Sequence, residues 1–120
     1  DIYLVDLHAE TTSEKIAFTY QFAGRVQAVV GTHTHVQTAD ERLVSGTAAI
    51  TDLGMCGAYT SVLGRDVQEI LTRFTTNEKT KFKIADGPGI LCGAVVRIDE
   101  TARKAIHIER IQIRPEQAEC

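Results

Sequence analysis

A strand–helix–strand pattern at the start of the chain is the feature that most constrains its fold. Residues 2–5 and 25–30 are short apolar runs rich in β-branched side chains, and polar residues follow each of them. Runs of this length and composition predict buried strands. A helix between two such strands predicts a right-handed parallel crossover, so the two strands should lie side by side with their carboxyl ends at one sheet edge.

Two helices are expected. Thr12 or Ser13 can cap the first, and Gly24 ends it. Its predicted apolar face consists of Ile16, Ala17 and Tyr20. The second helix is expected over residues 65–75, because apolar side chains recur there at helical spacing. These side chains, which we expect to pack against the sheet, are Val67, Ile70, Leu71 and Phe74.

The remaining elements are predicted to be strands and loops. Residues 47–51 indicate a short strand and residues 52–59 a loop, whereas residues 36–46 are polar without a clear element. Alternating patterns predict strands over residues 81–85, 90–98 and 105–113. Parallel strands therefore come first and antiparallel strands last, which indicates an α/β fold. We expect residues 1–120 to form a single domain or part of one.

Composition excludes several classes of function. The net charge is −3 and the 13 Lys and Arg residues are scattered, so we expect no duplex nucleic acid as a partner. The apolar runs are much shorter than the roughly 20 residues of a membrane-spanning helix, so no membrane association is expected. Three cysteines at unrelated spacings fit neither a disulfide framework nor a Cys-x-x-Cys zinc site, and we expect a cytoplasmic protein.

Three of the four histidines lie in two short polar segments after the first two predicted strands. These are His8, His33 and His35. The crossover rule brings the two segments to one sheet edge, and imidazole is the commonest metal ligand, so we predict that the three residues converge as a metal site. His107 alternates with isoleucines in the last predicted strand, and we expect it to lie elsewhere as an ordinary surface residue.

The ligand types leave the number of metal ions open. A single zinc ion held by three histidines would keep a position for a water molecule, whose pKa would fall to about 7. Two ions roughly 3.5 to 4 Å apart would need bridging carboxylates as well. The nearest carboxylates are Asp6, Glu10, Asp40 and Asp52, and each is more simply interpreted as a cap, a turn residue or a solvated charge.

Three segments carry a family resemblance. Residues 6–15 (DLHAETTSEK), 31–41 (GTHTHVQTADE) and 50–55 (ITDLGM) closely resemble the YmdB-like branch of the calcineurin-like metallophosphoesterases. The resemblance implies the carboxy-terminal half of an αββα sandwich and a bacterial, cytoplasmic phosphodiesterase. It further implies two divalent or mixed-valence ions, iron or manganese with zinc possible, and a cyclic nucleotide or small phosphodiester as substrate.

The same resemblance assigns roles to residues. His8 and His33 would bind one metal ion and His35 the other, and Gly31 would let the backbone turn tightly before the ligands. The chain begins at Asp1 without a methionine, and the family's amino-terminal half, with its carboxylate and asparagine ligands and its acid-acting histidine, has no counterpart in it. We therefore expect no catalytic residue here beyond the metal ligands, and little activity from this chain alone.

Two alternatives to a phosphodiesterase fragment remain open. The first is a non-catalytic binding or oligomerisation module derived from the same fold, since an uncovered apolar sheet favours a homo-oligomer. The second is an independent hydrolase with a single zinc ion, which would need only the three histidines that are present.

Overall fold

The computed structural model describes residues 1–116, which form two compact units. The first comprises Asp1–Gly54 and Cys92–Ile111, and the second comprises Met55–Leu91 with the described residues after Ile111. The expectation of a single domain stays a prediction. Neither helix within the described range has the length and apolar character needed to cross a membrane.

The first unit contains a four-stranded sheet in the order β1-β2-β4-β3. Its strands are β1 (Leu4–His8), β2 (Ala28–Thr32), β3 (Arg42–Val44) and β4 (Thr47–Ile50). β1 pairs with β2 in parallel, β2 pairs with β4 in parallel, and β3 pairs with β4 antiparallel. The predicted parallel pairing of the first two strands is therefore confirmed.

The first strand differs from its prediction in position and burial. It begins later than residues 2–5, and His8 is its last residue rather than the residue after it. β1 is the edge strand of the sheet among the described residues, and Ile2, Tyr3 and Leu4 are 43%, 56% and 68% exposed. The prediction that this run is buried was wrong, because no strand in the described part of the chain covers its outer edge.

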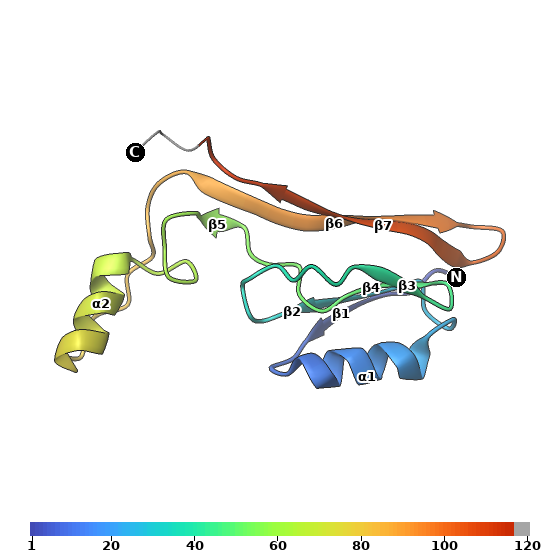
Figure 1. Ribbon diagram of the computed structural model, residues 1–120, viewed down its shortest axis with the longest axis horizontal. Helices are drawn as coiled ribbons and strands as arrows, with labels where there is room; N and C mark the ends of the chain where they lie inside the picture. Colours follow the sequence, from blue (N-terminus) through green and yellow to red (C-terminus); the bar gives the residue numbers. More distant parts are fainter. Residues whose placement is uncertain (117–120) are drawn as a thin grey trace. The chain divides into compact units, whose positions relative to one another are not determined.

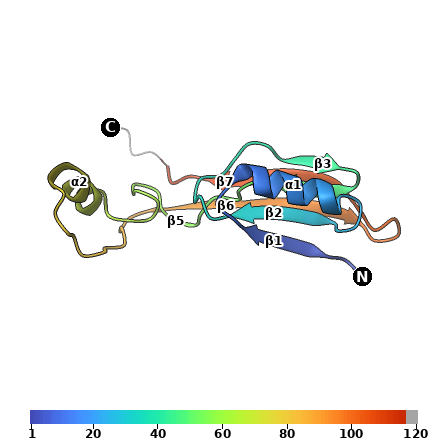
Figure 2. The ribbon, with the colours of Figure 1, turned by 90° about the horizontal axis from the view of Figure 1, so that it is seen from below.

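The first unit has three layers (Figures 1 and 2). Helix α1 (Thr12–Phe22) covers one face of the four-stranded sheet, and most of β6 (Gly89–Asp99) and β7 (Lys104–Ile113) covers the other. The last two strands were predicted correctly. The mixed α/β class, with parallel strands first and antiparallel strands last, is confirmed.

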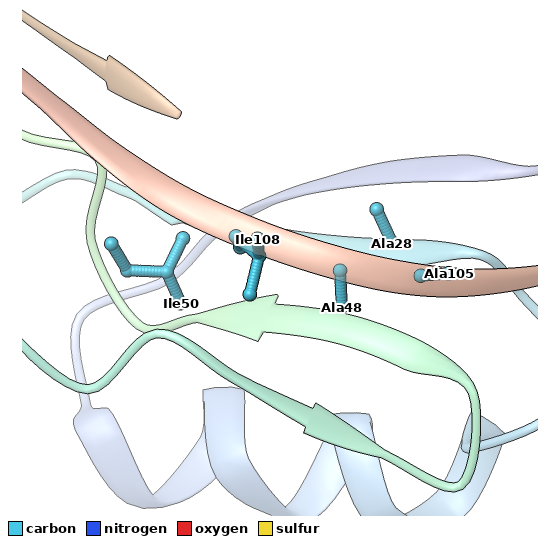
Figure 3. Close-up of a cluster of buried hydrophobic side chains, with 5 residues drawn as sticks. All are labelled: Ala28, Ala48, Ile50, Ala105 and Ile108. Atoms are coloured by element: carbon cyan, nitrogen blue, oxygen red, sulfur yellow. The ribbon is translucent and has the colours of Figure 1, made fainter. Parts of the chain in front are cut away.

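The hydrophobic core lies between the four-stranded sheet and β7 (Figure 3). Ala28, Ala48 and Ile50 come from the sheet, and Ala105 and Ile108 come from β7. Alanines at three of these positions let the two layers approach closely. Burial at this interface drives the docking of β7 on the sheet.

Helix α1 does not bury its predicted face. Thr11 is the N-cap, and the buried side chains are Lys15 and Thr19, whereas Tyr20 is 58% exposed. Lys15 and Thr19 are four residues apart and so share one side of the helix. A polar pair, and not the apolar residues, therefore points toward the sheet.

The second unit contains α2 (Val67–Thr76) and the short strand β5 (Gly57–Ala58), which pairs antiparallel with the first residues of β6. Asp66 caps α2, and Ile70 is its one buried residue. Leu71 and Phe74 are 46% and 77% exposed. The helix was predicted correctly, but the predicted burial of Leu71 and Phe74 was wrong.

Two further predictions about elements need correction. Residues 81–85 form no strand, and only one isolated bridge joins Ile84 to Arg65. β3 lies in the segment 36–46, for which no element was expected. Its three residues are too few to produce a recognisable alternation.

Candidate metal centre at the carboxyl ends of β1 and β2

The candidate site lies where β1 and β2 end next to each other. The parallel register pairs His8 with Thr32, so His33 is the first residue beyond the neighbouring strand. His8 Nε2 lies 3.1 Å from His33 Nδ1, and the two rings meet edge to face with their centroids 4.9 Å apart. The predicted convergence of these two histidines is confirmed.

A hydrogen-bonded chain orients the His8 ring. The Thr32 hydroxyl donates to Asp6 Oδ1 at 2.8 Å, and Thr32 Oγ1 lies 3.0 Å from His8 Nδ1. A threonine hydroxyl has one hydrogen, and here Asp6 accepts it. Thr32 Oγ1 therefore accepts from His8 Nδ1–H, and His8 Nε2 faces His33.

A carboxylate orients the His33 ring in a similar way. Glu10 Oε2 lies 2.6 Å from His33 Nε2, so Nε2–H donates to it and Nδ1 faces His8. Asp6 and Glu10, expected to be solvated or capping charges, thus each orient one histidine, Asp6 through Thr32 and Glu10 directly.

The His33-Thr34-His35 turn has an unusual backbone. His33 and His35 have φ values of 117° and 68°, a region that side chains with a Cβ seldom adopt. Such conformations cluster at functional sites and persist where the surroundings hold them. His35 follows His33 in this turn, but its convergence with His8 stays a prediction.

The side chain of Asp52 holds the His33-Thr34-His35 turn through the Thr34 amide. Its side chain is almost fully buried, accepts from Thr34 N at 2.9 Å and Gly54 N at 2.8 Å, and pairs with Lys15 Nζ at 3.3 Å. Burial alone would raise the pKa of Asp52, but the hydrogen bonds from Gly54 and Thr34 and the contact with Lys15 outweigh it, so the pKa is lowered. Asp52 therefore caps a turn through Gly54 N, as expected, but it is a buried anion and not a solvated charge.

Asp40 is the fourth carboxylate singled out by the sequence. It accepts from the Thr38 hydroxyl at 2.7 Å and from Thr51 N at 3.1 Å. Burial would raise its pKa, but the hydrogen bonds from Thr38 and Thr51 lower it. Asp40 therefore ties the segment after the histidines to the end of β4, as a turn residue would.

Gln37 anchors the same segment to the opposite layer of the first unit. Its Nε2 lies 3.2 Å from the carbonyl oxygen of Leu53 and 3.0 Å from those of Gly93 in β6 and Ile111 in β7. Sequence reasoning missed Gln37, Thr32 and Lys15. All three lie in the segments 6–15 and 31–41 that carry the family resemblance, which is the signal that could have found them.

Gly31 has a role different from the predicted turn. Its φ is not positive, but a Cβ at this position would lie 1.7 Å from the carbonyl oxygen of Thr51 and 3.0 Å from Lys15 Cδ. Glycine is required there because β2 and the end of β4 approach too closely for any side chain.

His107 lies in β7, half exposed, with Nε2 3.7 Å from Glu109. Among residues 1–116, no group of three or more His, Cys, Asp or Glu side chains is arranged to hold a metal ion. The ring nitrogens of His8 and His33 lie 3.1 Å apart, a spacing that suits two ligands of one ion. Metal–nitrogen bonds of 2.0 to 2.1 Å place adjacent ligands about 2.9 to 3.4 Å apart.

Relatives of the chain were found by sequence. A protein of Bacillus subtilis (strain 168) named 2′,3′-cyclic-nucleotide 2′-phosphodiesterase is 53% identical over 110 residues, which are 91% of this chain and 42% of that protein. A protein of Mycoplasma pneumoniae named putative phosphatase/phosphodiesterase is 41% identical over 115 residues, 94% of this chain and 41% of the relative. The chain thus spans about two-fifths of the length of these relatives.

Solved structures agree with this likeness. The crystal structure of a phosphatase from Mycoplasma pneumoniae matches with a TM-score of 0.87 and 40% identity, over 93% of this chain and 41% of that one. A hypothetical protein from Thermus thermophilus matches with a TM-score of 0.85 and 38% identity, over 93% of this chain and 44% of that one. The model of the YmdB-like protein family matches residues 1–111. The chain therefore belongs to the YmdB-like family.

Proposed function

We propose that this chain is part of a metal-dependent phosphodiesterase and provides histidine ligands to its metal site. The observation that carries the proposal is the contact between His8 Nε2 and His33 Nδ1, 3.1 Å apart at the carboxyl ends of two parallel strands. Ligand sites of open α/β sheets lie at such ends.

The ring orientations support metal binding by these two residues. Ligating histidines usually donate their other ring N–H to a carboxylate, carbonyl or hydroxyl group, which fixes the tautomer. His8 does so through Thr32 to Asp6, and His33 does so directly to Glu10. A cation between the two inner nitrogens would therefore meet two lone pairs.

A bound divalent cation would supply positive charge that polarises phosphoryl oxygens and lowers the pKa of water. The chain's own residues orient the ligands: Asp6 and Glu10 fix the rings, and Asp52 fixes the turn. We assign His35 to a second ion, as the likeness to the YmdB-like family implies. Iron or manganese are the proposed metals, as the family resemblance implies, and zinc is the alternative, since imidazole suits both iron and zinc.

We propose a cyclic nucleotide or another small phosphodiester as the substrate of the whole protein. The name of the Bacillus subtilis relative supports this choice. The 120 residues span only about two-fifths of that relative, so a family-length protein should be active and this chain alone should turn over poorly or not at all.

The test is a titration with Mn²⁺, followed by electron paramagnetic resonance, on the chain and on a family-length protein that contains it. His33→Ala should weaken Mn²⁺ binding at least tenfold in both and reduce hydrolysis of bis(p-nitrophenyl) phosphate by the longer protein. His107→Ala is the matched control, because it removes an imidazole from β7 and should change neither. Equal effects of the two substitutions would refute the ligand assignment.

A second candidate function, a homo-oligomerisation module, is favoured by an apolar groove in the first unit. Its volume is about 430 Å³, and apolar side chains of β1, β2 and β6, with Leu53, line most of it. β1 is unpaired on its outer side among the described residues, and Leu4 in the groove is 68% exposed. Unpaired strands and exposed apolar patches favour association, here with a second copy.

Light scattering after size exclusion tests this second candidate. Leu4→Lys should convert an oligomer to a monomer, whereas Leu43→Lys, on the opposite edge strand β3 and 44% exposed, should not. A monomeric unmodified chain at high concentration would eliminate this function.

A further inference from the structure

The most deeply buried charges of the first unit belong to Lys15 and Asp52, whose side chains are 3% and 1% exposed. Their charged atoms lie 3.3 Å apart. A buried ion pair is weak evidence for stability, because removing both charges from water costs about as much as their attraction returns. The metal ligands proposed above do not include either residue, so the pair calls for another explanation.

Asp52 uses both of its carboxylate oxygens. Oδ1 accepts from Gly54 N at 2.8 Å, and Oδ2 accepts from Thr34 N at 2.9 Å and from Lys15 Nζ. The Asp52 backbone is fixed separately, because Asp52 N donates to Thr38 Oγ1 at 2.9 Å and Thr38 N donates to Asp52 O at 3.1 Å. The side chain is therefore held in place to receive the Thr34 amide.

Thr34 lies between the two histidines with positive φ, His33 at 117° and His35 at 68°. Both are exposed, so packing does not impose these conformations on them. Left-handed and similar conformations of residues with a Cβ persist only where the surroundings determine them. The hydrogen bond from Thr34 N to Asp52 fixes the peptide between His33 and Thr34, at the centre of this turn.

We propose that Lys15 and Asp52 are positioning residues for the metal site: Asp52 holds the His33-Thr34-His35 turn through the Thr34 amide, and Lys15 holds and neutralises Asp52. This inference rests on the proposed function in one respect, since it takes the turn to present imidazoles to a metal ion. It adds that helix α1 helps to determine the geometry of the metal ligands, because its residue Lys15 pairs with Asp52.

The main test is the double variant Lys15→Met/Asp52→Leu, which replaces the pair by apolar side chains of similar size. Such replacements often preserve stability, because no unpaired charge is left. The matched control is Ile108→Val, which loosens the core between the sheet and β7 without touching the turn. All proteins are examined as the full 120-residue chain by NMR and by titration with Mn²⁺.

In the double variant, amide exchange at Thr34 should accelerate at least tenfold relative to exchange at Ala48 in the core. The strong intraresidue HN–Hα NOE that a positive φ produces should weaken at His35, and the Kd for Mn²⁺ should rise at least tenfold. Ile108→Val should leave the ratio of exchange rates, the NOE and the Kd unchanged. Unchanged Thr34 exchange in a folded double variant would overturn the proposal.

The unmodified chain provides an independent measurement that does not depend on folding of the variant. Thr34 and Gly54 donate to one carboxylate, so their amides should both be protected. Exchange of Thr34 at the rate of an unstructured peptide would overturn the proposal. If the unmodified chain binds no Mn²⁺ but Thr34 responds as expected, the metal function fails while the positioning of the turn stands.

Discussion

Gly31→Ala should destabilise the first unit by about 3 kcal/mol. The added Cβ would lie 1.7 Å from the Thr51 carbonyl oxygen, and Cβ contacts under 3.0 Å essentially never occur, so β2 must move away from the end of β4. That movement would stretch the hydrogen bond from Leu53 N to Gly31 O, now 2.8 Å long. Overpacking of this kind typically costs about 1 to 3 kcal/mol, and a lost hydrogen bond adds about 1.

Gly93→Ala is the matched control for this prediction. Gly93 lies in the same unit, its φ is not positive, and a Cβ there would meet nothing within 4 Å. It should therefore change stability little, or raise it by roughly 0.4 to 1 kcal/mol through the entropy of the unfolded chain. Urea unfolding measures both variants. Equal midpoints for Gly31→Ala and Gly93→Ala would refute the argument from strand approach.

Three further predictions concern α2, pH and metal binding. Ile70→Ala should cost about 2 to 5 kcal/mol because Ile70 is buried, whereas Phe74→Ala should change the unfolding midpoint little because Phe74 is 77% exposed. The pKa values of Asp40 and Asp52 are lowered from 3.8, so their contribution to stability is complete above that pH and is lost as the pH falls through the folded-state values. His33→Ala should weaken binding of Mn²⁺ at least tenfold in a titration.

Each of these predictions has an outcome that contradicts it. A large loss of stability in Phe74→Ala would show that the side of α2 that carries Phe74 is covered in solution. Unfolding midpoints that do not change between about pH 5 and pH 2 would show that neither aspartate is held as an anion. Unchanged Mn²⁺ affinity in His33→Ala would remove that residue from the ligand set.

The parallel crossover could be predicted because the apolar runs that form β1 and β2 are separated by a clear helix signal. The position of His8 beside His33 followed from it, since parallel strands place their carboxyl ends together. The packing of the helices could not be predicted in the same way. A helical apolar pattern identifies a side that can be buried, but it does not show whether that side is covered, and Phe74 is 77% exposed.

The supporting residues of the site were harder to predict than its histidines. Lys15 and Asp52 are 37 residues apart, and charged residues are usually solvated, so composition did not indicate that they form a buried pair. Gly31 looked like a turn residue, although glycine is required there because of the carbonyl group of Thr51, the residue after β4. The roles of Lys15, Asp52 and Gly31 all depend on contacts with residues that are distant in the sequence.

The contacts of Gln37 have a consequence for the order of folding. Its amide reaches carbonyl groups that are 16, 56 and 74 residues away along the chain, so the segment after the histidines cannot reach its final position until β7 has docked. Closing such long loops costs entropy before any contact compensates for it, and folding slows as the sequence separation of contacts grows. During synthesis, the segment around Gln37 should therefore reach its final position only after Ile111 has left the ribosome, whereas the contacts of Asp52 that hold the histidine turn involve only residues up to Gly54.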